Sequence, residues 1–246
     1  MLVLFALVAS RVGGLLLGAP VFSTRGLPQR FKAMLLFVLS AAILPAIPSS
    51  TLPESGYAVA VAMVNNFAVG FAIGLLVRIF LTAFQLAGAM ISFQMGFAMA
   101  RSLDPTSGDQ VPVIATIHLQ MVTTLFLLMD GHHLLIQSVA ASYEAFPIAA
   151  TVQLAAVNET LFSAGGLMYE AGARIAGPVT GVMLLINSLM GLLNRIVPTL
   201  SIFNIGFPIT VMSGLIVVTL SIPEVVNFFF RFYGTFERQL AGLLIG

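Results

Sequence analysis

The sequence lacks cysteine and tryptophan, and only 8% of its 246 residues carry a charge. Without cysteine, the chain forms no disulfide and offers no thiolate to a metal or cluster, which says nothing about its redox surroundings. A soluble domain has about a quarter charged residues. With so few charges, most of the surface must face lipid or other protein instead of water. We therefore predict an integral membrane protein.

Sequence motifs of several large functional classes are also missing. The formal net charge is only +1, so nucleic acid is not an expected partner. The chain is apolar from Met1 without a basic leader, so a cleaved signal peptide is not expected. There is no His-Glu-x-x-His helix, no Gly-x-Ser-x-Gly elbow and no phosphate-binding P-loop. We therefore expect a protein that is not an enzyme and needs no cofactor.

One group of residues raises the question of a metal site. Asp130, His132 and His133 lie together between two apolar runs. Adjacent histidines on a helix point about 100° apart, so they converge on one ion only where the backbone turns, as Gly131 permits. A polar loop at a helix end explains the same residues, and no metal is expected.

What the sequence contains is apolar runs, and 59% of its residues are hydrophobic. The expected helical segments are residues 1–22, 33–46, 56–100, 111–129, 134–146, 161–193 and 209–222. The intervening stretch 23–32 holds three of the ten basic residues, which indicates a cytoplasmic loop and an external N-terminus. The fold class we predict is all-α, a polytopic membrane protein of long, kinked helices and helical hairpins.

Three segments depart from simple membrane spans. Residues 56–100 would form a helix of about 67 Å, more than twice the roughly 30 Å of the hydrocarbon layer. This run is therefore a hairpin, a kinked helix, or a helix covered by protein. Pro178 should kink its helix. The last apolar run should end at Ile222, before Pro223, and leave an amphipathic tail from Phe228 that lies at an interface.

Small residues at four-residue spacing predict close helix packing. Gly70 and Gly74 form one such stripe. Gly88, Ser92 and Gly96 form a second stripe that leads into the most polar part of the chain. A third pair, Gly14 and Gly18, is a weaker signal because such spacing is common in apolar sequence.

Polar and charged residues inside apolar runs are candidates for function, because an ion at bilayer depth usually faces protein or water. The candidates for buried or inter-subunit polar contacts are Arg11, Arg78, Gln94, Glu170, Arg174, Asn194 and Arg195. Glu170 and Arg174 have the i, i+4 spacing of a helical ion pair. These groups fit a solute or proton path, contacts between subunits, or a simple pair near a membrane face.

The central stretch from Arg101 to Pro112 has one cation, two anions, two prolines and a glycine between long apolar runs. The Asp104-Pro105 pair favours extended or turning backbone, and Gly108 and its neighbours add turn chemistry. The sequence therefore predicts an irregular segment that contacts water or polar protein.

Four groups of short motifs resemble one known family. They are Arg11 with Ala19-Pro-Val-Phe22 and Pro28-Gln-Arg30; Ile91-Ser-Phe-Gln-Met-Gly96 with Asp104-Pro105; Asp130-Gly-His132; and Leu193-Asn-Arg195 with Pro198, Ile202-Phe203 and Gly206-Phe-Pro208. Together, and in this order, they are similar to the FliR family of flagellar proteins, the T/R subunits of type III secretion export gates. Thr199 and Asp130 depart from the glutamine and asparagine expected there.

This resemblance implies a non-enzymatic subunit that helps form and close a channel for unfolded substrates. It implies a P-like part (about residues 1–155) fused to a Q-like part (156–246) within one domain spanning residues 1–246. The implied partners are FliP-like and FliQ-like subunits, FlhB-like and FlhA-like components, unfolded secretion substrates and membrane lipid. The implied location is the bacterial inner membrane at the flagellar basal body, partly projecting to the periplasmic side.

The resemblance also gives the central stretch a role as the plug that closes the channel. The residues of this gating loop are Asp104, Pro105, Thr106, Ser107, Gly108, Asp109 and Gln110. The alternative that the charged residues leave open is a secondary transporter or channel for a small solute or protons. Broken helices such as the one expected at Pro178 occur in that class.

Overall fold

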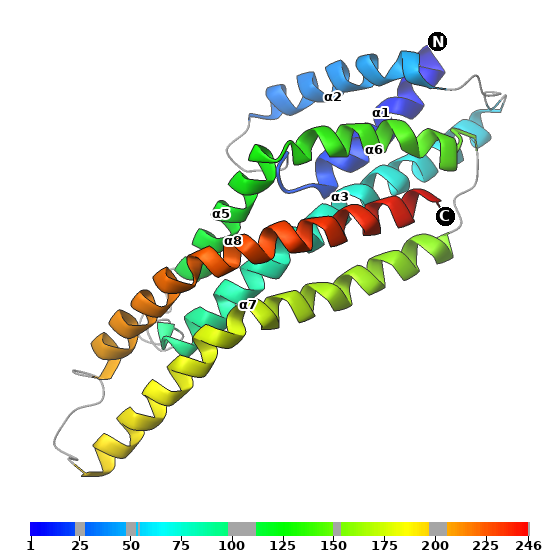
Figure 1. The fold of residues 1–246 in the computed structure, drawn as a ribbon. Helices are drawn as coiled ribbons and strands as arrows, with labels where there is room; N and C mark the ends of the chain where they lie inside the picture. The colour runs from blue at the N-terminus through cyan, green and yellow to red at the C-terminus, as the bar shows by residue number, and fades with distance from the viewer. Residues whose placement is uncertain are drawn as a thin grey trace. The chain divides into compact units, whose positions relative to one another are not determined.

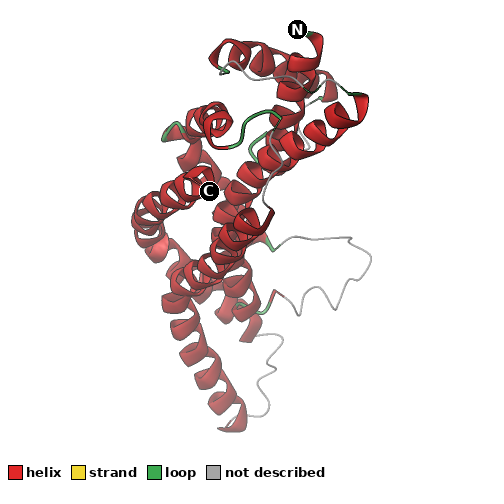
Figure 2. Ribbon diagram, turned by 90° about the vertical axis from the view of Figure 1, so that its right-hand side faces the viewer, coloured by secondary structure: helices red, strands yellow, loops and turns green. Residues whose placement is uncertain are grey.

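The computed structural model describes residues 1–22, 28–47, 53, 55–97, 112–149, 154–196 and 206–245. Every regular element in these ranges is a helix (Figure 2). In chain order, with the labels of Figure 1, they are α1 (Leu2–Gly18), α2 (Gln29–Ile43), η1 (Leu44–Ala46), α3 (Gly56–Gln94), α5 (Val113–Leu128), α6 (Gly131–Ala145), α7 (Leu154–Ile196) and α8 (Phe207–Ile245).

Several of these helices are long and apolar enough to cross a membrane. By length and composition there are four in the described ranges, or five if the bent pair α5 and α6 forms one span. The four are residues 29–46, α3, residues 157–196 and residues 207–244. This confirms the all-α, polytopic membrane fold that the composition predicts.

Helix α3 decides between the three forms considered for the long apolar run. It is one continuous helix of 39 residues, about 58 Å long at 1.5 Å per residue. A hairpin is therefore wrong. In its most apolar window, 61% of the residues are buried by the chain itself. The most apolar part of α3 is thus largely covered by the chain itself.

Two prolines lie inside helices that continue past them. Pro178 lies within α7 and Pro223 within α8. The expected end at Ile222 is therefore wrong, and α8 extends to Ile245. In apolar helices a proline is tolerated because neighbouring groups and local adjustments satisfy the freed backbone carbonyl.

The end of α8 also differs from the expected interfacial tail. Phe229, Tyr233, Phe236, Leu240 and Leu243 are all buried. Their spacing of three or four residues places them along one side of the helix. This part of α8 is therefore a core element of the fold, since its apolar side is covered by the chain itself.

The described chain forms two compact units, each made of separated segments. Unit 1 comprises residues 1–80, 123–166 and 234–246, and unit 2 comprises residues 81–122 and 167–233. Each unit combines segments from both sides of residue 155. The P-like and Q-like parts are therefore not the two compact units, and that division stays a prediction.

Aromatic rings form part of the core in each unit. In unit 1, the ring of Phe236 lies 4.9 Å from that of Phe80 and 6.1 Å from that of Phe126. In unit 2, Phe84 packs against Phe229, with ring centroids 5.7 Å apart. Such offset or tilted pairs add to the burial of apolar area. The many phenylalanines of the sequence thus include core residues.

Candidate functional site

The predicted gating loop cannot be placed, because Asp104, Pro105, Thr106, Ser107, Gly108, Asp109 and Gln110 lie outside the described residues. The structure does describe the helices on both sides of it. Helix α3 ends at Gln94, and α5 begins at Val113. The plug role stays a prediction.

The most developed polar site among the described residues surrounds Arg11 of α1. The side chain is 1% exposed. Its Nε donates to Asn66 Oδ1 of α3 (3.0 Å), Nη1 to Ser142 Oγ of α6 (2.8 Å) and Nη2 to the Phe146 carbonyl (2.7 Å). The guanidinium carbon lies 3.8 Å from the ring centroid of Tyr143. One cation therefore joins three helices of unit 1, which lie near one another in Figure 1.

Asn66 extends this network to the segment after α6. Its amide nitrogen donates to the Ala62 carbonyl at 2.7 Å and to the Ile148 carbonyl at 3.0 Å. Ser142 accepts from Arg11 and donates its own hydroxyl to the Val139 carbonyl at 2.6 Å. The polar atoms of Asn66 and Ser142 therefore all have hydrogen-bond partners, as buried polar groups generally do.

Arg11 has no carboxylate partner in the described ranges, where the ion pairs involve other residues. Arginine nevertheless keeps its proton. Its charge is stabilised by hydrogen bonds to neutral oxygens, including the Phe146 carbonyl at the C-cap of α6. The C-terminal end of a helix carries partial negative charge and favours a cation. The arrangement is that of a fixed structural clamp.

Glycines bring α1 and α3 close enough to build this clamp. A Cβ atom on Gly18 would lie 2.8 Å from the Phe71 carbonyl oxygen, and one on Gly74 would lie 2.7 Å from the Ala19 nitrogen. A Cβ on Gly70 would overlap the Arg11 carbonyl oxygen. The Gly14/Gly18 pair and the Gly70/Gly74 pair therefore face each other across one crossing, which sets the position of Arg11.

The second predicted stripe has mixed roles. A Cβ on Gly88 would lie 2.6 Å from Ala115 Cα, so Gly88 does pack α3 closely against α5 within unit 2. Ser92 is buried, at 2% exposure. Gly96 is different, because it lies beyond the end of α3 with a φ of +80°.

The helix-packing prediction for Gly96 needs correction. A Cβ there would lie 3.8 Å from the Phe207 ring, an ordinary van der Waals distance. What requires glycine at this position is the left-handed backbone, which residues with a Cβ rarely adopt.

The other predicted polar residues are not buried by their own chain. Glu170 and Arg174 form the predicted i, i+4 ion pair on α7, with side chains 53% and 67% exposed. Arg78 and Arg195 are exposed, and Asn194 is half-buried. Gln94 is half-buried, and its carbonyl accepts from Asn187 Nδ2 at 3.2 Å. Of the seven predicted residues, Arg11 is the one that the described chain encloses.

Sequence reasoning did not find Asn66, Ser142 or Tyr143. A signal was present for Asn66, which is one of two adjacent asparagines inside the apolar run of α3. Ser142 and Tyr143 occupy an ordinary-looking stretch, and only the fold brings them to Arg11.

Comparison with known proteins identifies the family. The family described as bacterial export proteins, family 1, matches residues 2–235. The chain is 33% identical to the flagellar biosynthetic protein FliR of Pectobacterium carotovorum subsp. carotovorum and 31% identical to that of Escherichia coli (strain K12). Each match covers 95% of this chain and 90% of the relative. The protein named FliR of Bacillus subtilis (strain 168) is 28% identical over 90% of this chain and 88% of its own length. The chain therefore belongs to the bacterial export proteins, family 1, together with these FliR proteins.

Proposed function

We propose that this protein is a non-enzymatic subunit of the flagellar type III protein export gate, where it helps form and close the channel for unfolded substrates. The observation that carries the proposal is the family match over residues 2–235, together with relatives of nearly equal length named flagellar biosynthetic proteins. The polytopic helical fold supports a place in the membrane, which we take to be the bacterial inner membrane at the basal body, with part of the chain projecting to the periplasmic side.

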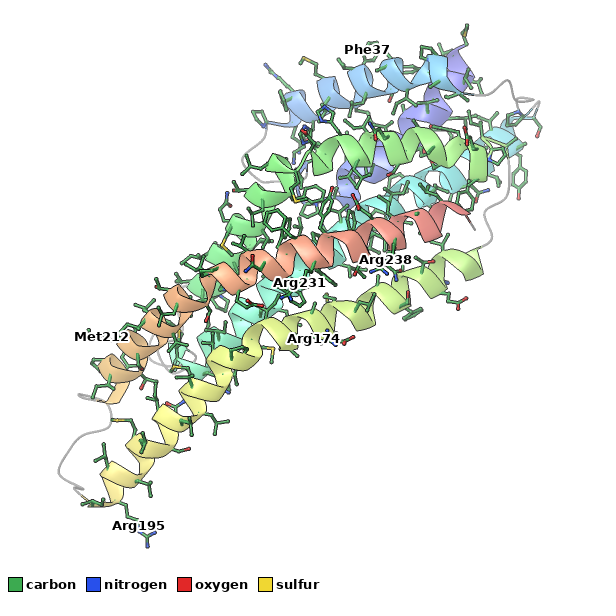
Figure 3. All side chains as sticks on the ribbon, in the orientation of Figure 1. Phe37, Arg174, Arg195, Met212, Arg231 and Arg238 are labelled. Atoms are coloured by element: carbon green, nitrogen blue, oxygen red, sulfur yellow. The ribbon has the colours of Figure 1, made fainter. Side chains whose placement is uncertain are left out.

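Exposed apolar surface supports assembly with other membrane subunits. In the most apolar window of the span 29–46, and in that of 207–244, only 11% of the residues are buried by this chain. Phe37 of α2 is 62% exposed and Met212 of α8 is 66% exposed, and both lie at the surface in Figure 3. Lipid and the proposed FliP-like and FliQ-like subunits would cover these faces. FlhB-like and FlhA-like components are proposed as further partners.

The polar sites support a structural role over a transport path. Arg11 is held by three hydrogen bonds to neutral groups, and Glu170 and Arg174 satisfy each other at the surface. Neither arrangement leaves a buried ionisable group poised to bind a solute. The closure role of residues 104–110 is carried over from the family resemblance, and we propose it on that ground.

The closure role is tested by deleting Thr106–Gln110 in cells that carry the complete export apparatus. We expect the variant to assemble, as judged by native gel electrophoresis, and to make the inner membrane permeable to small solutes. A deletion of equal length in the connection between η1 and α3, residues 48–52, is the control for general damage. An assembled variant with unchanged permeability would overturn the closure role while leaving membership of the gate intact.

Gate membership itself is tested by expression with and without partners. A gate subunit should be recovered in a stable complex only when FliP-like and FliQ-like proteins are co-expressed. A self-sufficient protein that moves a solute in reconstituted vesicles would instead support a transporter.

A further inference from the structure

The break between α5 and α6 in unit 1 is a tight, defined turn. The two helices are bent by 66° across Met129 and Asp130. Asp130 has φ 57° and ψ 25°, the left-handed conformation, which aspartate tolerates better than most residues. A Cβ on the next residue, Gly131, would lie 2.5 Å from Cζ of the Phe126 ring. Local packing therefore fixes this turn, and glycine is needed at its second position.

The turn brings three metal-ligating side chains together. Asp130, His132 and His133 each offer one ligand atom, and these atoms lie within 4.8 Å of one another. The two imidazole rings have centroids 4.3 Å apart. Neighbouring histidines diverge on a regular helix. Here His132 and His133 lie in the first turn of α6, directly after the left-handed Asp130. The Asp130 carboxylate lies close to both imidazoles.

One imidazole nitrogen of the cluster has no hydrogen-bond partner among the described residues. His133 Nδ1 lies 3.1 Å from Asp130 Oδ1, so two atoms that can ligate a metal are already side by side, and a bound ion would replace their hydrogen bond. His132 Nδ1 is buried and has no hydrogen-bond partner in the described part of the chain. A buried nitrogen left unpaired is unfavourable. A metal ion would provide the missing partner for the imidazole of His132.

We propose that Asp130, His132 and His133 bind a divalent transition-metal ion of the zinc class. Two imidazoles and a carboxylate suit Zn²⁺ and its neighbours, whereas Mg²⁺ and Ca²⁺ prefer oxygen ligands alone. In a tetrahedral site with bonds of 2.0–2.1 Å, ligand atoms are roughly 3.4 Å apart. His133 and Asp130 are 64% and 74% exposed, so small side-chain rotations close the remaining distance.

The ion would brace the turn between the two helices. It would bind one residue before α6 and two residues in its first turn, and so hold Asp130 in the left-handed conformation. Because the cluster is exposed on one side, water completes the coordination. This site is independent of the export function proposed above, since it rests only on the geometry of the turn.

The test uses the full-length protein in detergent, purified through a tag without histidine. Titration with Zn²⁺ should give one equivalent bound per chain, and Co²⁺ should give the visible absorption of a site with nitrogen and oxygen ligands. His132→Ala and His133→Ala should each weaken binding by at least about 10-fold. Asp130→Asn should weaken it too while keeping the turn, because asparagine also adopts the left-handed conformation.

Two variants outside the cluster serve as controls. His118→Gln replaces the histidine of the sequence that lies outside the cluster and is buried on α5. Glu144→Gln replaces an exposed acid on α6. Both should bind zinc as the unchanged protein does. Zinc should also raise the thermal midpoint of the unchanged protein but not that of folded His132→Ala. Absence of stoichiometric binding, or equal affinity in the cluster variants and the controls, would overturn the proposal.

Discussion

Two regions of the molecule both contain glycines and an arginine on apolar helices, but the chain buries these residues in one region and leaves them exposed in the other. At the crossing of α1 and α3 in unit 1, glycines contact the opposing backbone and Arg11 is 1% exposed. On α7 in unit 2, a Cβ on Gly177 or Gly181 would meet no atom within 4 Å, and the side chain of Arg174 is 67% exposed. The first region is completed by the chain itself, and the second is open to other molecules.

The difference shows what an apolar sequence leaves undecided. Lipid and protein neighbours are both apolar, so hydrophobic runs do not reveal which of them will cover a helix. The chain itself buries 61% of the most apolar window of α3 but only 22% of that of α7. Substitutions that distinguish a self-completed region from an open one therefore test the comparison directly.

The largest difference is expected between Gly70→Ala and Gly177→Ala. A methyl group at position 70 would overlap the Arg11 carbonyl oxygen, so α1 and α3 must separate. Overpacking of this kind costs about 3 kcal/mol or more when backbone must move. The monodisperse yield and the thermal midpoint of the protein in detergent should fall sharply for Gly70→Ala and stay nearly unchanged for Gly177→Ala. Outside its own chain neighbours the new methyl group at position 177 meets no atom within 4 Å, and the following Pro178 offsets the helix propensity that alanine would add. Similar behaviour of the two variants would refute the close crossing.

The next largest difference is expected between Arg11→Met and Arg174→Met. Loss of Arg11 leaves the buried Asn66 Oδ1 and the partly buried Phe146 carbonyl without their donor, which should lower the free energy of unfolding by about 2–4 kcal/mol. Loss of Arg174 removes an exposed ion pair worth less than about 1 kcal/mol. Denaturant unfolding in detergent measures both.

Arg11→Lys sharpens the same test. Lysine keeps the charge but cannot reproduce a planar group that bonds in three directions. It should recover less than half of the loss. Full recovery would show that charge alone matters at this position and would count against the clamp.

The sequence predicted the fold class, because it follows from composition, and it placed Arg11 among seven candidates for buried or inter-subunit contacts without showing which of them the chain buries. The partners of Arg11 could not be predicted, since Asn66 lies 55 residues away along the chain and Ser142 lies 131 residues away. Four-residue spacing identified Gly70 and Gly74 and, as a weaker signal, Gly14 and Gly18, but it did not show that the two pairs pack against each other. The same spacing misassigned Gly96, because a sequence pattern continues past a helix end whereas the helix does not.

The helices that contain proline show a second case in which a sequence pattern did not predict where a helix ends. Pro223 indicated the end of a helix, since proline lacks the N–H group that continues the hydrogen-bond ladder. The structure continues through it because the following residues bury an apolar face within unit 1, from Phe236 to Leu243. Tertiary burial over several turns outweighs one missing backbone hydrogen bond.

The smallest effect, and the only stabilising one, is expected for Gly181→Ala. Alanine is a better helix former than glycine by about 0.8–1.0 kcal/mol. A Cβ at position 181 would meet no atom within 4 Å, so the isolated protein should gain roughly 0.5 kcal/mol in unfolding free energy. Gly181→Leu should likewise leave the isolated protein folded, as circular dichroism and the thermal midpoint would show. If a partner helix covers this face of α7, the leucine variant should co-purify less of the complex than the alanine variant. Equal recovery of the complex with alanine and with leucine would show that lipid, and not a partner, covers Gly181.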